Sequence, residues 1–152
     1  MLNTGWKVLA VDITADGFDN IRLKVQKEYL HNLEVKEERF ESVSLPSADL
    51  VNGSFSLPFC HPDVFHLFWN RIVDAINFDG RFSGNFFGNR DEWTLQQDVT
   101  FKTESQVIEM FDGFDIEYFN EIEFDGPTVF DNIIKHWHIF EVIAKKKVEK
   151  GT

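Results

Sequence analysis

The chain has 152 residues and a mass of 17.8 kDa, with 43% hydrophobic and 15% aromatic residues, so it has room for one globular domain with a substantial core. Its formal net charge of -11 would repel a nucleic-acid backbone, and the only basic cluster, AKKKVEKGT at the end, is typical of a solvated tail. No apolar run approaches the roughly 20 residues of a membrane helix, and MLNTGWK lacks the features of a signal peptide. A single cysteine, Cys60, excludes an internal disulfide and favours a reducing compartment, so we expect a cytoplasmic protein. From the charge and the lack of a long apolar run, we expect it to bind neither nucleic acid nor membrane.

The first third of the chain predicts a strand, a helix and two further strands. Residues 8–11 form a continuous apolar run that stops at Asp12, which is typical of a strand covered on both faces. Residues 15–30 have helical spacing, with acidic residues toward the start and basic residues toward the end, as a helix dipole favours. Residues 33–46 alternate in part and predict a more exposed strand, and Leu50 and Val51 begin another buried strand.

The rest of the chain contains the clearest helix signal, in residues 61–80. Pro62 suits a first helical position and Gly80 a C-terminal stop. One apolar stripe joins these ends and consists of Phe65, Phe68, Trp69, Ile72, Val73 and Ile76. A glycine-interrupted strand (80–88), a loop (89–101) and a short helix (103–111) with capping-box spacing at Thr103 and Gln106 follow. Residues 114–124 and 135–146 predict two strands of a hairpin around the loop 125–132.

This alternation of strands and helices predicts an α/β fold. Right-handed crossovers would produce a mostly parallel sheet, and the C-terminal hairpin would add an antiparallel edge. The sequence shows no repeat, linker or domain break, so we predict one domain over residues 1–147 and a tail over 148–152.

Three segments resemble the class I S-adenosylmethionine-dependent methyltransferases. GWKVLAVDIT resembles the second strand of that family and its acid, RFESVSLPSADLVNGSFSLPFC the segment through the fourth strand, and FDGRFSGNFFGNRDEW the fifth strand. Within the class, the chain is most similar to small bacterial methyltransferases of the tellurite-resistance and thiopurine type. The resemblance implies a Rossmann-like three-layer sandwich that transfers a methyl group from S-adenosylmethionine to a small-molecule acceptor.

The chain departs from this family at its most diagnostic motif. Only eleven residues precede Asp12, and there is no glycine-rich fingerprint, so the resemblance implies an N-terminally truncated fold without the first strand. That strand would lie between residues 8–11 and the strand of Leu50 and Val51, leaving two apolar edges. The chain would then have to pair these edges directly, take a strand from a partner in a homo-oligomer, or be only marginally stable. The alternative function is a non-catalytic methyltransferase remnant that acts as an oligomeric interaction module; a small-molecule carrier with an aromatic interior is a third possibility.

The resemblance assigns cofactor contacts to two turns in the first third of the chain. Asp12 would hold the ribose hydroxyls, although a helix-capping acid before TADGF is the simpler interpretation of the residue alone. Ile13 would pack on the adenine or ribose. Phe40 and Glu41 would flank the adenine, the alternative being an ordinary buried Phe beside a solvated Glu.

A third turn, NGSFSLPF, would hold the methionine end of the cofactor through Asn52, Gly53, Ser54 and Phe55. A sulfonium is a cation without hydrogen-bond donors, so carbonyl oxygens and the face of Phe55 are suitable neighbours. The alternative is a packed strand-to-helix turn with Pro58 as punctuation. Methyl transfer needs chiefly proximity and orientation, so we predict no catalytic residue.

Acceptor contacts are expected from Arg90, Trp93 and His136. Arg90 and Trp93, with Asp91 and Glu92 between them, follow the fifth strand of the resembled fold at its ligand edge and would line the acceptor pocket, with Trp93 as a lid; the alternative is a surface loop with one anchored Trp. His136 belongs to the segment KHWH, which resembles the last strand of the family and implies a contact with cofactor or acceptor. His136 and His138 share one face of a strand, but two ligands do not make a metal site, so we predict no metal.

Overall fold

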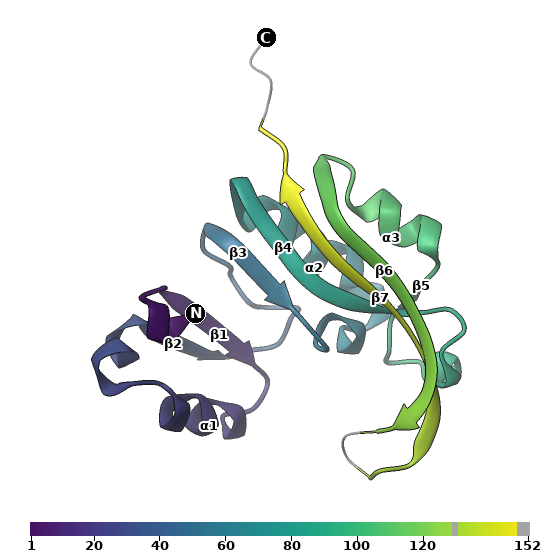
Figure 1. The fold of residues 1–152 in the computed structure, drawn as a ribbon, viewed down its shortest axis with the longest axis horizontal. Helices are drawn as coiled ribbons and strands as arrows, with labels where there is room; N and C mark the ends of the chain where they lie inside the picture. The colour runs from purple at the N-terminus through teal and green to yellow at the C-terminus, as the bar shows by residue number, and fades with distance from the viewer. Residues whose placement is uncertain (129–130, 149–152) are drawn as a thin grey trace. The chain divides into compact units, whose positions relative to one another are not determined.

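The structure is a computed structural model that describes residues 1–128 and 131–148 (Figure 1). The chain forms two compact units, residues 1–44 (unit 1) and 45–152 (unit 2), and each is described by itself. Part of the predicted hairpin loop, residues 129–130, and most of the predicted tail, residues 149–152, lie outside the described residues. The prediction of one domain over residues 1–147 stays a prediction.

Unit 1 is a small parallel α/β unit. Its elements in chain order are the 3-10 helix η1 (Leu2–Thr4), β1 (Val8–Asp12), α1 (Asp16–Lys24), the 3-10 helix η2 (Lys27–Asn32) and β2 (Leu33–Glu37). β1 and β2 pair in parallel, with Val8 opposite Leu33 and Asp12 opposite Glu37. The predicted strand–helix–strand order is therefore confirmed, although the helix and the second strand are shorter than predicted.

Two details of unit 1 correct the sequence analysis. The apolar residues of β1 are half-buried rather than buried, because β1 pairs only with β2 among the described strands. β2 ends at Glu37, so Phe40 and Glu41 lie in the turn that follows the strand. Charged residues at both helix ends stabilise α1 as predicted, with Asp16 in its first turn and Lys24 in its last.

Unit 2 is built on a mixed sheet. Its strands are β3 (Ala48–Gly53), β4 (Ile76–Gly88), β5 (Phe101–Lys102), β6 (Phe114–Pro127) and β7 (Ile134–Lys146). Its helices are η3 (Leu57–Phe59), α2 (Pro62–Ala75), η4 (Glu92–Leu95) and α3 (Glu104–Met110). The strand order is β3-β4-β7-β6, and the short β5 also pairs with β4. β3 and β5 run parallel to β4, whereas β7 is antiparallel to both β4 and β6, as the predicted hairpin requires.

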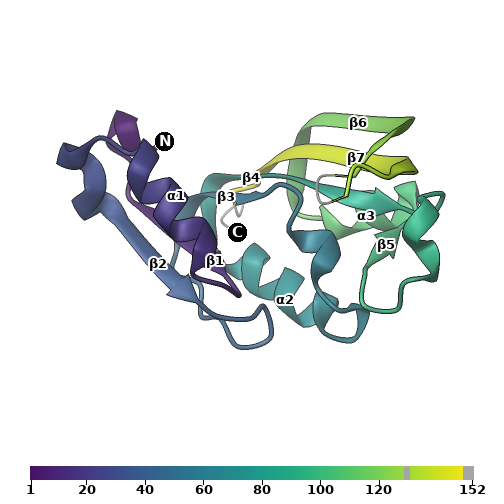
Figure 2. The ribbon, with the colours of Figure 1, turned by 90° about the horizontal axis from the view of Figure 1, so that it is seen from below.

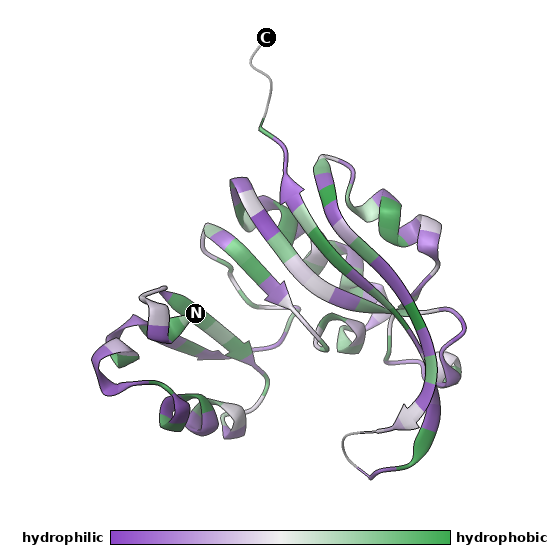
Figure 3. Cartoon of the chain, viewed as in Figure 1, coloured by the Kyte–Doolittle hydropathy of each residue, from purple (hydrophilic) through white to green (hydrophobic). Residues whose placement is uncertain are grey.

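Helices α2 and α3 cover one face of this sheet (Figure 2). Unit 2 by itself therefore has two layers, and the three-layer arrangement predicted for the whole chain stays a prediction. Trp69 of α2 packs edge-to-face on Phe82 of β4 and on Phe111 after α3, each at a ring-centroid distance of 5.1 Å. The hydropathy colouring shows mixed polar and apolar residues along the strands and helices (Figure 3).

The local signals of both helices of unit 2 are confirmed, with one correction. Pro62 occupies the first turn of α2, and α3 begins with a complete capping box of Thr103 and Gln106. α2, however, ends at Ala75, and Ile76 already belongs to β4. Gly80 is thus not a helix stop: it lies within β4, where an added Cβ would be 2.8 Å from the carbonyl oxygen of Asn77.

The second edge of β1 and the second edge of β3 have no paired strand among the described residues. These are the two edges at which the sequence analysis placed a missing strand. Among the same residues, no helix is long and apolar enough to cross a membrane.

Candidate functional site

The carboxyl edge of unit 1 contains Asp12, the last residue of β1. Its Oδ1 accepts a hydrogen bond from the backbone N–H of Thr14 at 3.0 Å and contacts the Thr14 hydroxyl at 3.4 Å. Ala15, not Asp12, is the N-cap of α1, and no side chain caps that helix. The helix-capping interpretation is therefore wrong, and Asp12 presents an exposed carboxylate at the end of a parallel strand, beside an exposed Ile13.

Phe40 and Glu41 follow the neighbouring strand, β2, at the same edge of unit 1. Phe40 is half-buried and Glu41 is exposed. Because β1 and β2 are parallel, the turns that follow them lie at the same edge of the sheet. This is the carboxyl edge, where open α/β sheets bind ligands.

The carboxyl end of β3 carries the second predicted stretch, Asn52 to Phe55. The Oδ1 of Asn52 accepts from the backbone N–H of Ser54 at 3.3 Å. Gly53 lies opposite Gly84 of β4, and a Cβ on Gly84 would be 3.0 Å from the Gly53 carbonyl, so both backbones approach closely here. Phe55 is 54% exposed, so this turn presents an aromatic side chain to solvent.

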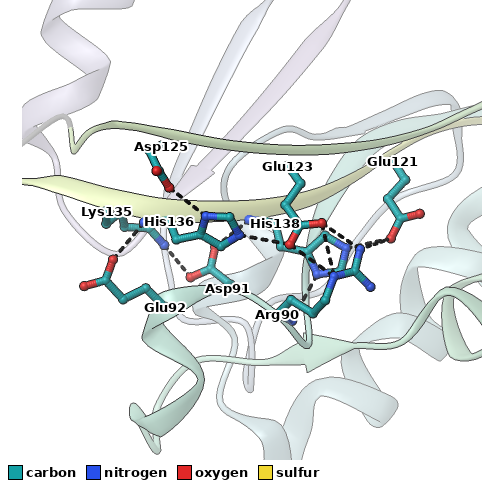
Figure 4. A network of polar contacts seen from close by, with 9 residues as sticks. All are labelled: Arg90, Asp91, Glu92, Glu121, Glu123, Asp125, Lys135, His136 and His138. Carbon is teal, nitrogen blue, oxygen red and sulfur yellow. Dashed lines mark hydrogen bonds and ion pairs between the residues drawn. The ribbon is translucent and has the colours of Figure 1, made fainter.

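A polar network occupies the carboxyl end of β4 in unit 2 (Figure 4). Three acids, Glu121, Glu123 and Asp125, alternate along β6 and so share one face of that strand. The Arg90 guanidinium donates from Nε to both oxygens of Glu123 at 3.1 Å and from Nη2 to Glu121 at 2.7 Å. Hydrogen bonds from Arg90 and, to a smaller extent, His136 lower the pKa of Glu123 to about 2. Hydrogen bonds to Glu123 and Glu121 in turn raise the pKa of Arg90.

His138 joins this network from a fully buried position in β7. Its Nδ1 accepts from the backbone N–H of Arg90 at 3.0 Å, so the ring proton is carried by Nε2, which donates to Glu121 at 2.8 Å. The ring lies against Gly88, where an added Cβ would be only 2.0 Å from Nδ1. Gly88 therefore leaves the room that His138 needs to hold the Arg90 backbone.

His136 is held between two carboxylates. Its Nδ1 is 2.7 Å from Asp125 and its Nε2 is 2.9 Å from Glu123. These hydrogen bonds, with Glu123 first and Asp125 second, raise the pKa of His136 because they stabilise the charged ring. The ring of His136 therefore stays protonated to a higher pH than a free imidazole.

The base of the network is a buried ion pair between Lys135 and Asp91. The Lys135 side chain is 2% exposed and that of Asp91 is fully buried. The ammonium lies 3.9 Å from the ring centroids of both Trp93 and Trp137, which places it in an aromatic cage. Asp91 also accepts from the backbone N–H groups of Trp93 and His138, so one carboxylate fixes the loop after β4 to the start of β7.

Trp93 is anchored in this cage. Besides Lys135, it packs on Phe59, Phe87 and Trp137, at ring-centroid distances of 6.5, 6.2 and 5.5 Å. This matches the anchored-Trp alternative better than a lid. Phe59 belongs to η3, so it links the turn after β3 to the loop after β4 within unit 2.

The structure thus brings Arg90, Trp93 and His136 to one end of the sheet. It gives contacts to Asp91, Lys135 and His138, which belong to the two segments that the sequence analysis assigned to the acceptor. It also adds residues that the sequence analysis did not assign: Asn85, Glu121, Glu123 and Asp125. A signal for part of this set was present, because alternate acids in one predicted hairpin strand face the KHWH segment of the other. No sequence signal pointed to Asn85. Among the described residues, no group of three or more His, Cys, Asp or Glu is arranged to hold a metal ion.

The arrangement fits ligand binding and orientation at a sheet edge. The guanidinium of Arg90 and the carboxylates of Glu121 and Glu123 are about one-third to one-half exposed, so they can meet a polar molecule. The predicted absence of a dedicated catalytic residue stays a prediction.

The fold is shared with solved methyltransferases. TehB from Haemophilus influenzae superimposes with a TM-score of 0.78 at 14% identity, over 94% of this chain and 51% of that one. Burkholderia thailandensis 1,6-didemethyltoxoflavin-N1-methyltransferase, solved with S-adenosylhomocysteine, gives a TM-score of 0.67 at 17% identity, over 97% and 64%. N-methyltransferase NodS from Bradyrhizobium japonicum, also solved with S-adenosylhomocysteine, gives 0.65 at 7% identity, over 92% and 66%.

The chain therefore has the fold of S-adenosylmethionine-dependent methyltransferases, and the resemblance seen in the sequence is confirmed at the level of fold. It spans about half the length of TehB and about two-thirds of the other two enzymes. No protein-family model matches the sequence, and no curated protein matches it.

Proposed function

We propose that this chain binds S-adenosylmethionine and takes part in methyl transfer to a small-molecule acceptor in the cytoplasm. The observation that carries the proposal is the shared fold with an exposed carboxylate, Asp12, at the end of a parallel strand. Two of the predicted cofactor contacts have suitable chemistry. The carboxylate of Asp12 suits a pair of ribose hydroxyls, and the exposed ring of Phe55 suits a sulfonium.

In this proposal the residues of the chain bind the cofactor and orient the acceptor. Asp12 holds the ribose, Ile13, Phe40 and Glu41 adjoin the adenine, and residues 52–55 meet the methionine end. When bound, S-adenosylmethionine supplies an electrophilic methyl group. Arg90, Trp93 and His136 orient the acceptor. Arg90 and His136 both contact Glu123, and Trp93 packs on Lys135, the residue before His136. Two of the similar structures are described as N-methyltransferases, so amines and nitrogen heterocycles are the first acceptors to screen.

The proposal is tested by calorimetry with S-adenosylmethionine and S-adenosylhomocysteine. We expect binding that Asp12→Ala weakens by about 10- to 100-fold, since a hydrogen bond to a charged group contributes about 1.5–3 kcal/mol. Asp16→Ala is the matched control, because Asp16 is an exposed acid in α1 of the same unit. A folded wild-type chain that binds neither compound would refute the proposal.

The second candidate function is an oligomeric interaction module without catalysis. It is favoured by the open edges of β1 and β3, each of which presents unpaired backbone groups of a parallel strand among the described residues. This candidate predicts a homo-oligomer in sedimentation velocity and no cofactor binding. A monomer that binds S-adenosylhomocysteine would exclude it.

A further inference from the structure

Phe55 has an unusual backbone conformation for its residue type. Its φ is +50°, in the left-handed region, where bulky side chains are strained. Strain of this kind persists only where the surroundings impose it, and it is concentrated at ligand-binding sites. The ring is also 54% exposed, so the strained residue contributes little to the core of unit 2.

The side chain of Asn85 holds this conformation. Its Oδ1 accepts a hydrogen bond from the backbone N–H of Phe55 at 2.7 Å, although the two residues are 30 positions apart. Asn85 is 4% exposed in β4, so its amide lies in the buried part of unit 2. The close approach of Gly53 and Gly84, one residue before Asn85, brings the turn within reach of this buried amide.

We propose that Asn85 is a positioning residue, which holds Phe55 in the left-handed conformation so that its ring stays exposed at the carboxyl end of β3 and contacts the sulfonium of the cofactor. This inference rests on the proposed function and adds a residue to it. The hydrogen bond satisfies the buried oxygen of Asn85, and it does so by stabilising an exposed aromatic residue in a strained conformation. A turn that served packing alone would be better built with Gly or Asn at position 55, because both tolerate positive φ.

The test compares a charged with an uncharged ligand. Phe55→Leu keeps an apolar side chain but removes the π face, so affinity for S-adenosylmethionine should fall about 5- to 30-fold. Affinity for S-adenosylhomocysteine should fall much less, because its thioether has no charge. Phe78→Leu is the matched control, since Phe78 is 53% exposed elsewhere in unit 2, and it should change neither affinity.

A second pair of variants separates positioning from folding. Phe55→Asn should keep or raise the melting temperature, because Asn tolerates positive φ, yet it should lose affinity for S-adenosylmethionine as Phe55→Leu does. Asn85→Ala should lose the same affinity in the wild-type background and none in the Phe55→Asn background, because Asn85 acts through Phe55.

The outcomes distinguish this inference from the proposed function. If the wild-type chain binds neither compound, the proposed function fails and the role of Phe55 fails with it. If the wild-type chain binds both, but Phe55→Leu affects them equally or not at all, only this inference is overturned. Additive losses in the double variant of Asn85 and Phe55 would also overturn it.

Discussion

The ion pair of Lys135 and Asp91 offers the sharpest test of how the candidate site is held together. The perturbation is Lys135→Met, which keeps the length and apolar stem of the side chain but removes the ammonium. Both partners are almost completely buried, with side-chain exposures of 2% and 0%. Without Lys135, the Asp91 carboxylate would remain in the core with no counter-charge.

The expected loss follows from this burial. Removing one partner of a buried ion pair costs about 3–5 kcal/mol, because the other charge stays desolvated and uncompensated. The two backbone N–H groups that donate to Asp91, at 3.0 and 3.2 Å, soften this cost but cannot replace a full charge. The loss of the Lys135 contacts with two tryptophan rings acts in the same direction. A loss of this size is a large part of the stability of an ordinary domain.

Equilibrium unfolding in urea measures the loss, with tryptophan fluorescence as the signal. Trp69, Trp93 and Trp137 all lie in unit 2 and report on it. The double variant Lys135→Met/Asp91→Asn should recover part of the stability, because it removes the buried charge as well. Lys145→Met is the matched control: its partner Asp79 is 2.9 Å away, but the side chains are 34% and 64% exposed, so the expected loss is below about 1 kcal/mol. If Lys135→Met cost no more than Lys145→Met, the argument from burial would be refuted.

Two further predictions concern the histidines. Gly88→Ala would place a Cβ 2.0 Å from the Nδ1 of His138, so the ring must move and unit 2 should lose about 1–3 kcal/mol; an unchanged thermal midpoint would contradict this. Because Glu123 and Asp125 raise the pKa of His136, its stabilising charge is fully present below its ordinary pKa of 6.5 and is lost as the pH rises through the higher folded-state pKa. The melting temperature of wild type minus that of His136→Gln should therefore be largest near pH 5.5 and shrink toward pH 9, and a difference that grew with pH would show the opposite sign of coupling.

The secondary structure that could be predicted from the sequence is the part that depends on local spacing. The capping box of Thr103 and Gln106 is a three-residue signal, and the structure contains both of its hydrogen bonds. The predicted end of α2 was wrong because local spacing gave a misleading signal there. Ile76 continues the apolar pattern of the helix, so periodicity cannot tell that the chain turns into β4 at this residue.

Apart from His136, which lies in a predicted strand, site residues were predicted where a residue follows a predicted strand. Asp12 and Phe55 were assigned in this way, as was Arg90 after β4. Asn85 lies inside β4, and the significance of its amide depends on a turn 30 positions earlier in the chain. The same limit applies to Lys135 and Asp91, which are 44 residues apart.

The sequence by itself determined the order of the longer strands and helices and the C-terminal hairpin, because periodicity, capping and turn residues act over a few neighbouring positions. The resemblance to methyltransferases was carried by three quoted segments of the chain. Only the tertiary structure decided that hydrogen-bonded strands form two separate sheets, that a lysine and an aspartate share a buried aromatic cage, and that a buried amide holds a strained Phe55. These features arise from contacts between residues far apart in the chain, where burial removes water and makes each missing partner costly.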